Sequence, residues 1–346
     1  MGVLSAKAVD LSAVREEATS SFVARLAAVN GIPAADVLDD LGVRARHGLD
    51  PRTSEVLVNG RGLGMLAVLA GRDEAHLRRA LPTAASGPGA PRARPARIGP
   101  WPAGWTVLAE CAGCTARRSD GLPPAWLAVR ASWQVCVRHG QWLQSADRAQ
   151  HMSLAGLEEV VEAHRRRVRL EQRVGPYARA LLADALQVTG YWWQCRQMGS
   201  DTVWAVRERA LGLVRQPRAL PLVVYPEAVT VAEAMAVHER QRGWGRDFDN
   251  GAPDWVSRRW ITWVGERLGM PEQMEHGGYR ALRTWTVRHR ITTPVVARRA
   301  QTAPPPGYRS GQMQPLEPHR PLSEDDMLEE SSCLPWRLGG PVTSLP

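Results

Sequence analysis

Lysine is almost absent from this 346-residue chain, which contains only Lys7 although lysine and arginine together number 44. A P-loop ATPase needs the lysine of G-x-x-x-x-G-K, a pattern that does not occur here, and Schiff-base or pyridoxal-phosphate enzymes need a lysine amine. Kinase chemistry built on a strand lysine is excluded in the same way, because Lys7 lies at the N-terminus. The scarcity of lysine thus removes several large enzyme classes.

Long apolar runs are also missing, so the sequence predicts no transmembrane helix. The first twenty residues contain charges such as Lys7, Asp10 and Arg15 and do not resemble a signal peptide. Cysteine numbers only five, an odd count, which favours reduced thiols that bind metal or pack in a core. We therefore expect a cytoplasmic protein with no membrane association.

The residues that are abundant favour a folded protein with an anionic partner. Hydrophobic residues make up 44% of the chain, enough for a sizeable core, and the aromatic residues are 14 Trp against 5 Tyr and 2 Phe. The net charge is +9 and almost every positive charge is an arginine. A basic protein of this kind favours nucleic acid as its partner, with DNA first.

The N-terminal region predicts two pairs of short helices. Phe22, Leu26 and Val29 share one helical face, Ser20 or Ser21 can cap the helix, and Asn30-Gly31 ends it, after which Pro33 opens a second helix. A weaker pair follows, ending in a helix over 73–81. We expect residues 18–81 to be a helical unit of helix-turn-helix character, preceded by a loose leader. The alternative is a plain helical bundle that does not contact DNA.

Residues 82–102 hold six prolines, three glycines and the arginines Arg92, Arg94 and Arg97. This composition predicts a linker. Its arginines are candidate nucleic-acid contacts along phosphates or in a minor groove, and a solvated linker without such contacts is the favoured alternative.

The clearest long helix is predicted over 154–173, with an apolar stripe that includes His164, which we expect to be a core histidine. Glutamates lie early and arginines late, which suits the helix dipole, and Glu162 and Arg166 are spaced as an i,i+4 ion pair. Four arginines of the basic end are candidate contacts for nucleic acid: Arg165, Arg166, Arg169 and Arg173. An ordinary solvated face is the alternative.

The rest of the chain predicts a helical, Trp-rich domain over 151–300 and a disordered tail over 301–346. Within the domain, 221–231 is predicted to be a short strand or an extended connection, and most tryptophans are expected in the core. The tail carries the acidic residues Glu324, Asp325, Asp326, Glu329 and Glu330, interrupted by Met327, Leu328, Leu334 and Trp336. That mixture is typical of a peptide that docks on a partner.

The strongest motif is Cys111-x-x-Cys114, followed after 21 residues by Cys136-x-x-His139. Three thiolates and one imidazole at this spacing predict a tetrahedral Zn²⁺ site within a small module over 103–150. Four protein ligands leave no position for water, so we expect a structural zinc. Neither H-E-x-x-H, G-x-S-x-G nor a deaminase pattern occurs, and we expect no enzymatic activity.

Several of these segments together resemble the TniQ family of transposon accessory proteins, which are similar to the target-selecting TnsD proteins. The resemblance rests on "SFVARLAAVNG", "LAGRDEAHL", the C-x-x-C pair and W-x-x-C-x-x-H-G-x-x-L (Trp133, Cys136, His139, Gly140 and Leu143), and covers roughly residues 18–145. It implies a mainly α protein that combines helix-turn-helix elements with zinc modules. It also implies a link between target DNA, or an RNA-guided complex, and an AAA+ ATPase regulator of the transposase.

Two other functions remain open. A DNA-binding regulator unconnected with transposition would bind a defined operator, as a homodimer. A protein–protein scaffold would bind through the Trp-rich half and the acidic tail, without DNA.

Overall fold

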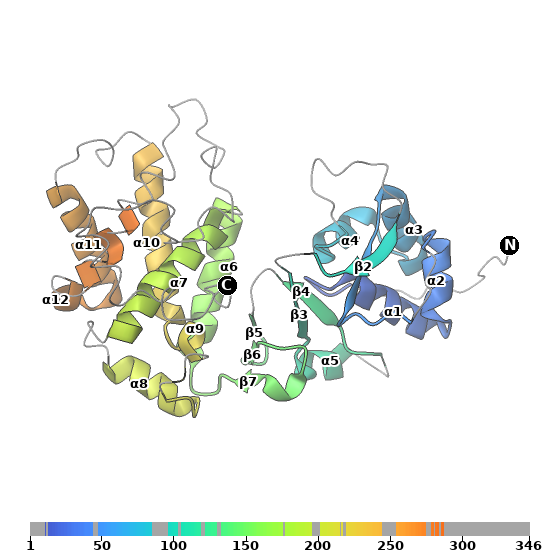
Figure 1. Cartoon of the computed structure of the whole chain (residues 1–346), viewed down its shortest axis with the longest axis horizontal. Coiled ribbons are helices and arrows are strands. Elements are labelled where there is room, and N and C mark those ends of the chain that lie inside the picture. Colours follow the sequence, from blue (N-terminus) through green and yellow to red (C-terminus); the bar gives the residue numbers. More distant parts are fainter. Residues whose placement is uncertain are drawn as a thin grey trace. The chain divides into compact units, whose positions relative to one another are not determined.

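The computed structural model is mainly helical, as expected, and divides into two compact units, Met1–Ser153 and Leu154–Pro346 (Figure 1). It describes residues 11–286 except 12, 44–47, 85–95, 103–104, 119–121, 130–132, 176, 196–200, 215, 217–218, 244–253, 275–277, 280 and 284. The predicted tail over 301–346 and the candidate contacts Arg92 and Arg94 lie outside these residues.

The first part of unit 1 contains two helical hairpins and one small sheet. Its elements are α1 (Thr19–Asn30), α2 (Ala34–Asp40), β1 (Ser54–Leu57), α3 (Gly60–Ala70), α4 (Glu74–Ala80) and β2 (Arg97–Pro100). Gly31 and Gly71 end α1 and α3 in the left-handed conformation, with φ of 63° and 61°, which glycine adopts without strain. Three-residue turns then lead into α2 and α4, so both helical pairs expected from the sequence are present.

The first hairpin has the geometry of a helix-turn-helix pair. α1 and α2 meet at 114°, within the range of about 90–120° for that motif. Phe22, Leu26 and Leu38 of this pair are buried in the core of the unit, together with Leu66 and Leu77 from the second hairpin.

No single helix in the described part of the chain is long and apolar enough to cross a bilayer; only the bent pair α1–α2 passes that test of length and composition.

The segment 82–102, expected to be a linker, instead contributes strand β2. Residues 97–100 pair antiparallel with β1, and Val56 lies opposite Ile98. Ile98 packs against the same core that buries Val56, so the segment gains apolar contacts by pairing. Proline and glycine content alone does not show such a long-range pairing.

Helix α1 is not capped by Ser20 or Ser21, contrary to the expectation from the sequence. The N-cap residue is Ala18, whose side chain cannot accept a hydrogen bond. Glu55 of β1 takes over that role: its carboxylate accepts hydrogen bonds from the Thr19 backbone N–H at 2.7 Å and from the Ser20 hydroxyl at 2.7 Å. A buried carboxylate at the positive end of α1 thereby replaces a local cap.

The second part of unit 1 is a set of short strands around one short helix. Strand β3 (Thr106–Ala109) pairs antiparallel with β4 (Trp126–Val129), and β5 (Gln134–Cys136), β6 (Gln141–Leu143) and β7 (Met152–Ser153) form a second sheet. Helix α5 (Ala112–Arg118) follows β3, and a 3₁₀ turn (Arg148–Gln150) precedes β7. The second sheet runs to Ser153, so it extends past the expected boundary at 150.

The segment before α1, expected to be a loose leader, joins the two parts of unit 1. The backbone N–H of Ala18 donates to Trp126 O at 2.8 Å, and that of Ala128 donates to Glu16 O at 2.7 Å. Residues 16–18 therefore lie beside β4, with an isolated antiparallel bridge between Glu17 and Leu127. This pairing ties the helical hairpins to the strands of the predicted zinc module.

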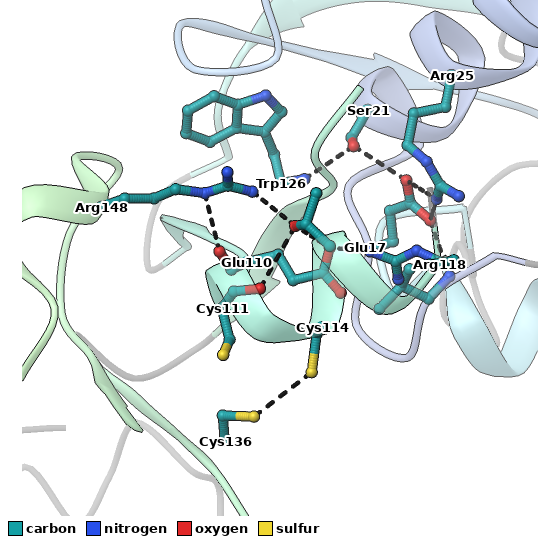
Figure 2. A network of polar contacts seen from close by, with 12 residues as sticks. Glu17, Ser21, Arg25, Glu110, Cys111, Cys114, Arg118, Trp126, Cys136 and Arg148 are labelled. Carbon is teal, nitrogen blue, oxygen red and sulfur yellow. Dashed lines mark hydrogen bonds and ion pairs between the residues drawn. The ribbon is translucent and has the colours of Figure 1, made fainter. Parts of the chain in front are cut away.

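A buried ion pair lies at this junction (Figure 2). Arg25 of α1 donates to both carboxylate oxygens of Glu17 at 2.8 Å, and both side chains are almost completely buried. The Ser21 hydroxyl donates to Glu17 at 3.0 Å and accepts the Trp126 backbone N–H at 2.9 Å. One continuous network thus runs from α1 to β4.

Unit 2 is a helical bundle in which α10 packs against α6 and α7. Its elements are α6 (Glu158–Val174), α7 (Tyr177–Cys195), α8 (Asp201–Ala210), α9 (Leu220–Val223), α10 (Tyr225–Gly243), α11 (Asp254–Leu268) and α12 (Pro271–Gln273). The expectation of a strand or extended connection over 221–231 is wrong, because this segment forms α9 and the start of α10. Pro221 and Pro226 each stand in a first helical turn, where proline is tolerated, and the β-branched residues between them are buried.

Core packing accounts for most of the tryptophans of unit 2, as expected, although Trp263 of α11 is half-buried with Arg267 over its ring. Trp192, Trp193, Trp204, Trp260 and Trp285 are all buried. Two of them fix polar partners in the interior, since Trp193 donates to Glu208 at 2.6 Å and Trp285 to Asp184 at 2.7 Å. These rings therefore do not form an exposed surface for base stacking.

Substitutions at the buried Glu17–Arg25 pair test how much it contributes to the stability of unit 1. Arg25→Met leaves Glu17 buried without its cation, and we expect unit 1 to lose about 3–5 kcal/mol of stability. The double variant Glu17→Gln/Arg25→Met should recover most of this loss. It removes both charges, together with the Arg25 Nε and Nη2 atoms, which have no hydrogen-bond partner among the described residues. Urea unfolding of the full chain, with hydrogen exchange of the α1 amides, measures both effects.

The matched control for that test is Arg52→Met. Arg52 pairs with Asp50 at the surface, at 2.9 Å, and an exposed pair of this kind contributes little to stability. If Arg25→Met cost no more than Arg52→Met, the pair would not be what holds α1 on β4.

Glu55 should make the stability of unit 1 depend on pH. Burial raises its pKa above the ordinary 4.5, although hydrogen bonds from Thr83, Ser20 and Thr19 act in the opposite direction. Because the folded pKa is raised, its contribution to stability is full below the unfolded pKa and is lost as pH rises through the folded value. Glu55→Gln does not titrate, so its stability relative to the parent should increase with pH. Unfolding curves at several pH values above 4.5 measure this difference, and parallel pH profiles for the two proteins would contradict it.

Candidate metal centre

The structure brings the four residues predicted to bind metal into one cluster. The Nδ1 atom of His139 lies 3.5 Å from Cys111 Sγ, 3.3 Å from Cys114 Sγ and 3.6 Å from Cys136 Sγ. The Cys114 and Cys136 sulfurs are 3.5 Å apart, and all four atoms lie within 4.8 Å of one another. A tetrahedral ion with bonds of about 2.3 Å to sulfur and 2.0 Å to nitrogen has edges of about 3.5–3.8 Å, so the cluster is compatible with one metal ion.

Each ligand pair comes from a tight local structure. Cys111 directly precedes α5 and Cys114 lies in its first turn, so the x-x spacing places both sulfurs at the same helix end. Cys136 ends β5, and His139 lies in the turn that leads into β6. Gly140 has a φ of 55°, a left-handed conformation that allows the chain to reverse immediately after His139.

Gly113 allows these two pairs to approach each other. A Cβ atom built at this position would lie 2.8 Å from Cδ2 of the His139 ring. Contacts that short do not occur, so any side chain at 113 would push the imidazole or the start of α5 away. The glycine between the two cysteines is therefore a steric requirement of this site.

Polar contacts fix the backbone beside Cys111. Arg148 Nε donates to the Glu110 carbonyl oxygen at 3.1 Å, and its Nη2 donates to Thr115 Oγ1 at 2.7 Å. The Glu110 carboxylate accepts from Thr115 and pairs with Arg118 (Figure 2). These contacts hold the Cys111–Cys114 pair in position through its neighbours. Glu110, Thr115, Arg118 and Arg148 were not identified from the sequence. Only Glu110 carries a local signal, because it is next to Cys111.

Three ionised thiols in this cluster would be electrostatically unfavourable without a bound cation. Burial raises the pKa of Cys111, and it raises that of Cys114 to about 12, with Cys136 adding to both shifts. Three thiolates this close together would repel one another unless a positive charge lay between them. A metal ion provides that charge and displaces the protons. The cluster is thus suited to bind a metal ion as a unit.

The predicted row of arginines on α6 is largely engaged in ion pairs. Arg165 and Arg169 both pair with Glu162, at 3.2 and 2.8 Å. Arg166 pairs with Glu233 of α10 at 2.6 Å, which corrects the expected Glu162–Arg166 pair. Arg173 is exposed and has no acidic partner among the described residues, and Arg97 is exposed on β2.

His164 is a core residue, as expected. It is buried, and its Nδ1 lies 3.0 Å from the hydroxyl of Tyr225 on α10. It takes no part in the metal cluster.

Comparisons of the chain with protein-family models, curated proteins and solved structures find no match.

Gly113→Ala tests the geometry of the cluster. Because the new methyl group would meet the His139 ring, we expect the affinity for Co²⁺, used as a spectroscopic probe, to fall by roughly tenfold or more. The matched control is Gly99→Ala, since a Cβ at Gly99 meets no atom within 4 Å. Titration of the metal-free chain, followed by the absorption of the tetrahedral thiolate complex, measures both. Equal affinities for the two variants would refute the proposed packing of α5 on His139.

Proposed function

We propose that this protein is an adaptor, not an enzyme, that contains a structural zinc site and acts in target selection for DNA transposition. One observation carries the proposal: a single compact unit contains both the Cys₃His cluster and the two helical hairpins. The same residues carry the resemblance to TniQ proteins, which implies that combination. The role in transposition rests on that resemblance alone.

Zinc is the metal that the donor set favours. Thiolate sulfurs are soft ligands, and a tetrahedral set of three sulfurs and one imidazole nitrogen is typical of structural zinc. Cys111, Cys114, Cys136 and His139 would occupy all four positions. The proposed role of the ion is therefore to fold and hold the module.

The exposed charges of unit 1 favour one hairpin over the other as a DNA contact. Helix α2 exposes Asp36, Asp39 and Asp40, which would repel a phosphate backbone. Helix α4 instead exposes Arg78 and Arg79 in its last turn, of which Arg78 pairs with Glu74 of the same helix at 3.2 Å. We propose that the second hairpin, with Arg97 of β2, lies toward DNA and that the acidic face of α2 lies away from it.

The proposed partners follow from the resemblance. They are target DNA or an RNA-guided complex on one side, and an AAA+ ATPase regulator of the transposase on the other. The test is affinity purification of the tagged full-length chain from its own host, with identification of the proteins and nucleic acids recovered. We expect the ATPase together with a transposase or a guide-RNA complex.

Other results of that purification would support different functions. A discrete DNA segment without transposition proteins would favour a regulator, and a protein partner without nucleic acid would favour a scaffold. Cys111→Ser, which removes one ligand, should lose both zinc and partners. Val137→Ser, an exposed position between the ligands Cys136 and His139, is the matched control and should keep both.

The salt dependence of DNA binding tests whether the arginines of α6, which the sequence makes candidate nucleic-acid contacts, also bind DNA. Each phosphate contact changes the slope of log K against log salt by about −0.9. Arg173→Ala should therefore make the slope shallower by about that amount. Glu162→Gln should make it steeper, because it releases Arg165 and Arg169. Fluorescence anisotropy at a series of salt concentrations measures both.

The control for the slope is Arg52→Ala, which removes an arginine that is paired with Asp50 in unit 1. We expect it to leave the slope unchanged. Identical slopes for the parent, Arg173→Ala and Glu162→Gln would show that α6 does not contact DNA.

A further inference from the structure

Helix α8 exposes an apolar face to solvent. Among the described residues, five large hydrophobic side chains are exposed, and three of them lie on α8 or just after it: Val203, Val206 and Val214, at 42%, 54% and 57%. Val203 and Val206 are three residues apart, so they share one side of the helix. The outer face of α6, by contrast, carries charged residues such as Glu162, Arg165 and Arg169. Two exposed valines on one side of a helix form a small apolar patch that suits contact with another apolar segment.

The opposite side of α8 is fixed firmly in unit 2, so this face cannot turn inward. Trp204 and Arg207 are buried, and both bond to Glu227 of α10, at 3.0 and 2.6 Å. Arg207 also donates to the Val223 carbonyl oxygen at 2.7 Å. These bonds hold Val203 and Val206 outward.

A positive charge borders the valines. Arg209 is exposed, and among the described residues its Nε donates to the carbonyl oxygen of Ala205 in its own helix, at 3.1 Å. Glu208 is turned inward to Trp193 and does not neutralise the outer face. The face defined by Val203, Val206 and Arg209, here called the α8 face, therefore suits an apolar segment that carries negative charge.

The same chain contains a segment of that composition. Residues 324–336 read EDDMLEESSCLPW, with five acidic residues, no basic residue and four large apolar ones, in a chain whose net charge is +9. The 37 residues between 286 and 324 span roughly 33 Å even as a flexible coil. A unit of this size has a radius of gyration of about 14 Å, so the segment can reach any of its faces. Tethering also raises its local concentration to about the millimolar range.

We propose that residues 324–336 dock on the α8 face of their own chain, with Met327 and Leu328 against Val203 and Val206 and the acidic side chains toward Arg209. This inference is independent of the proposed role in transposition. It assigns a partner to the acidic, apolar segment that the adaptor function leaves without one.

Photo-cross-linking of the full chain tests the docking. A photoreactive amino acid at Ser331 lies between the two apolar pairs of the segment without replacing either. We expect cross-links to peptides of α8, with a yield that does not depend on protein concentration. Val206→Asp should reduce this yield about tenfold, because it removes an apolar contact and places a negative charge against the segment.

The matched control is Val68→Asp, an exposed valine of α3 in unit 1, which should leave the yield unchanged. Circular dichroism and thermal melting of both variants should match the parent, since both positions are at the surface. Cross-links that join two chains and increase with concentration would overturn the proposal in favour of a second copy as the occupant. Cross-links to other elements, or equal yields in the two variants, would overturn it outright.

Discussion

Three sulfur atoms and one imidazole nitrogen occupy a space less than 4.8 Å across, and the local fold of unit 1 depends on that constraint. The strands around them have two to four residues each. The core beside the cluster consists of Leu108, Leu127, Val129 and Leu143, and the stacked rings of Trp133 and Trp142 are buried in the same module. So small an apolar core rarely folds without a disulfide or a bound metal ion. A structural zinc ion contributes about 10–16 kcal/mol in zinc-finger peptides, enough to make folding of such a module favourable.

The same constraint extends to the helical hairpins through β4. Residues 16–18 pair with this strand, and α1 begins immediately after them, so the start of α1 is set by the edge of the metal module. Two buried carboxylates lie at this end of α1 and are stabilised differently. Glu17 has a guanidinium partner, whereas the donors to Glu55 are neutral backbone and hydroxyl groups. Helix position and metal-site folding are thereby coupled within one unit.

The sequence predicted correctly those structural features that depend on residues close together in the chain. The apolar stripe of Phe22 and Leu26, the left-handed Gly31 and the spacing of the four metal ligands each depend on neighbours within a few residues, and the structure contains them all. It was uninformative where a contact joins distant segments. The pairing of Val56 with Ile98, the cap supplied by Glu55 and the partner of Arg166 depend on the tertiary fold. At 221–231 the pattern was misleading, because β-branched residues beside two prolines favour an extended chain until helix packing buries them.

The central claim is that the metal cluster holds α1 in place as well as its own module. Hydrogen exchange of the full chain, with metal bound and after chelation, tests it most directly. Our account predicts that the amides of α1 lose protection together with those of β3 to β6, while α7 and α10 in unit 2 keep theirs. Full protection of α1 after residues 106–143 have opened would contradict it.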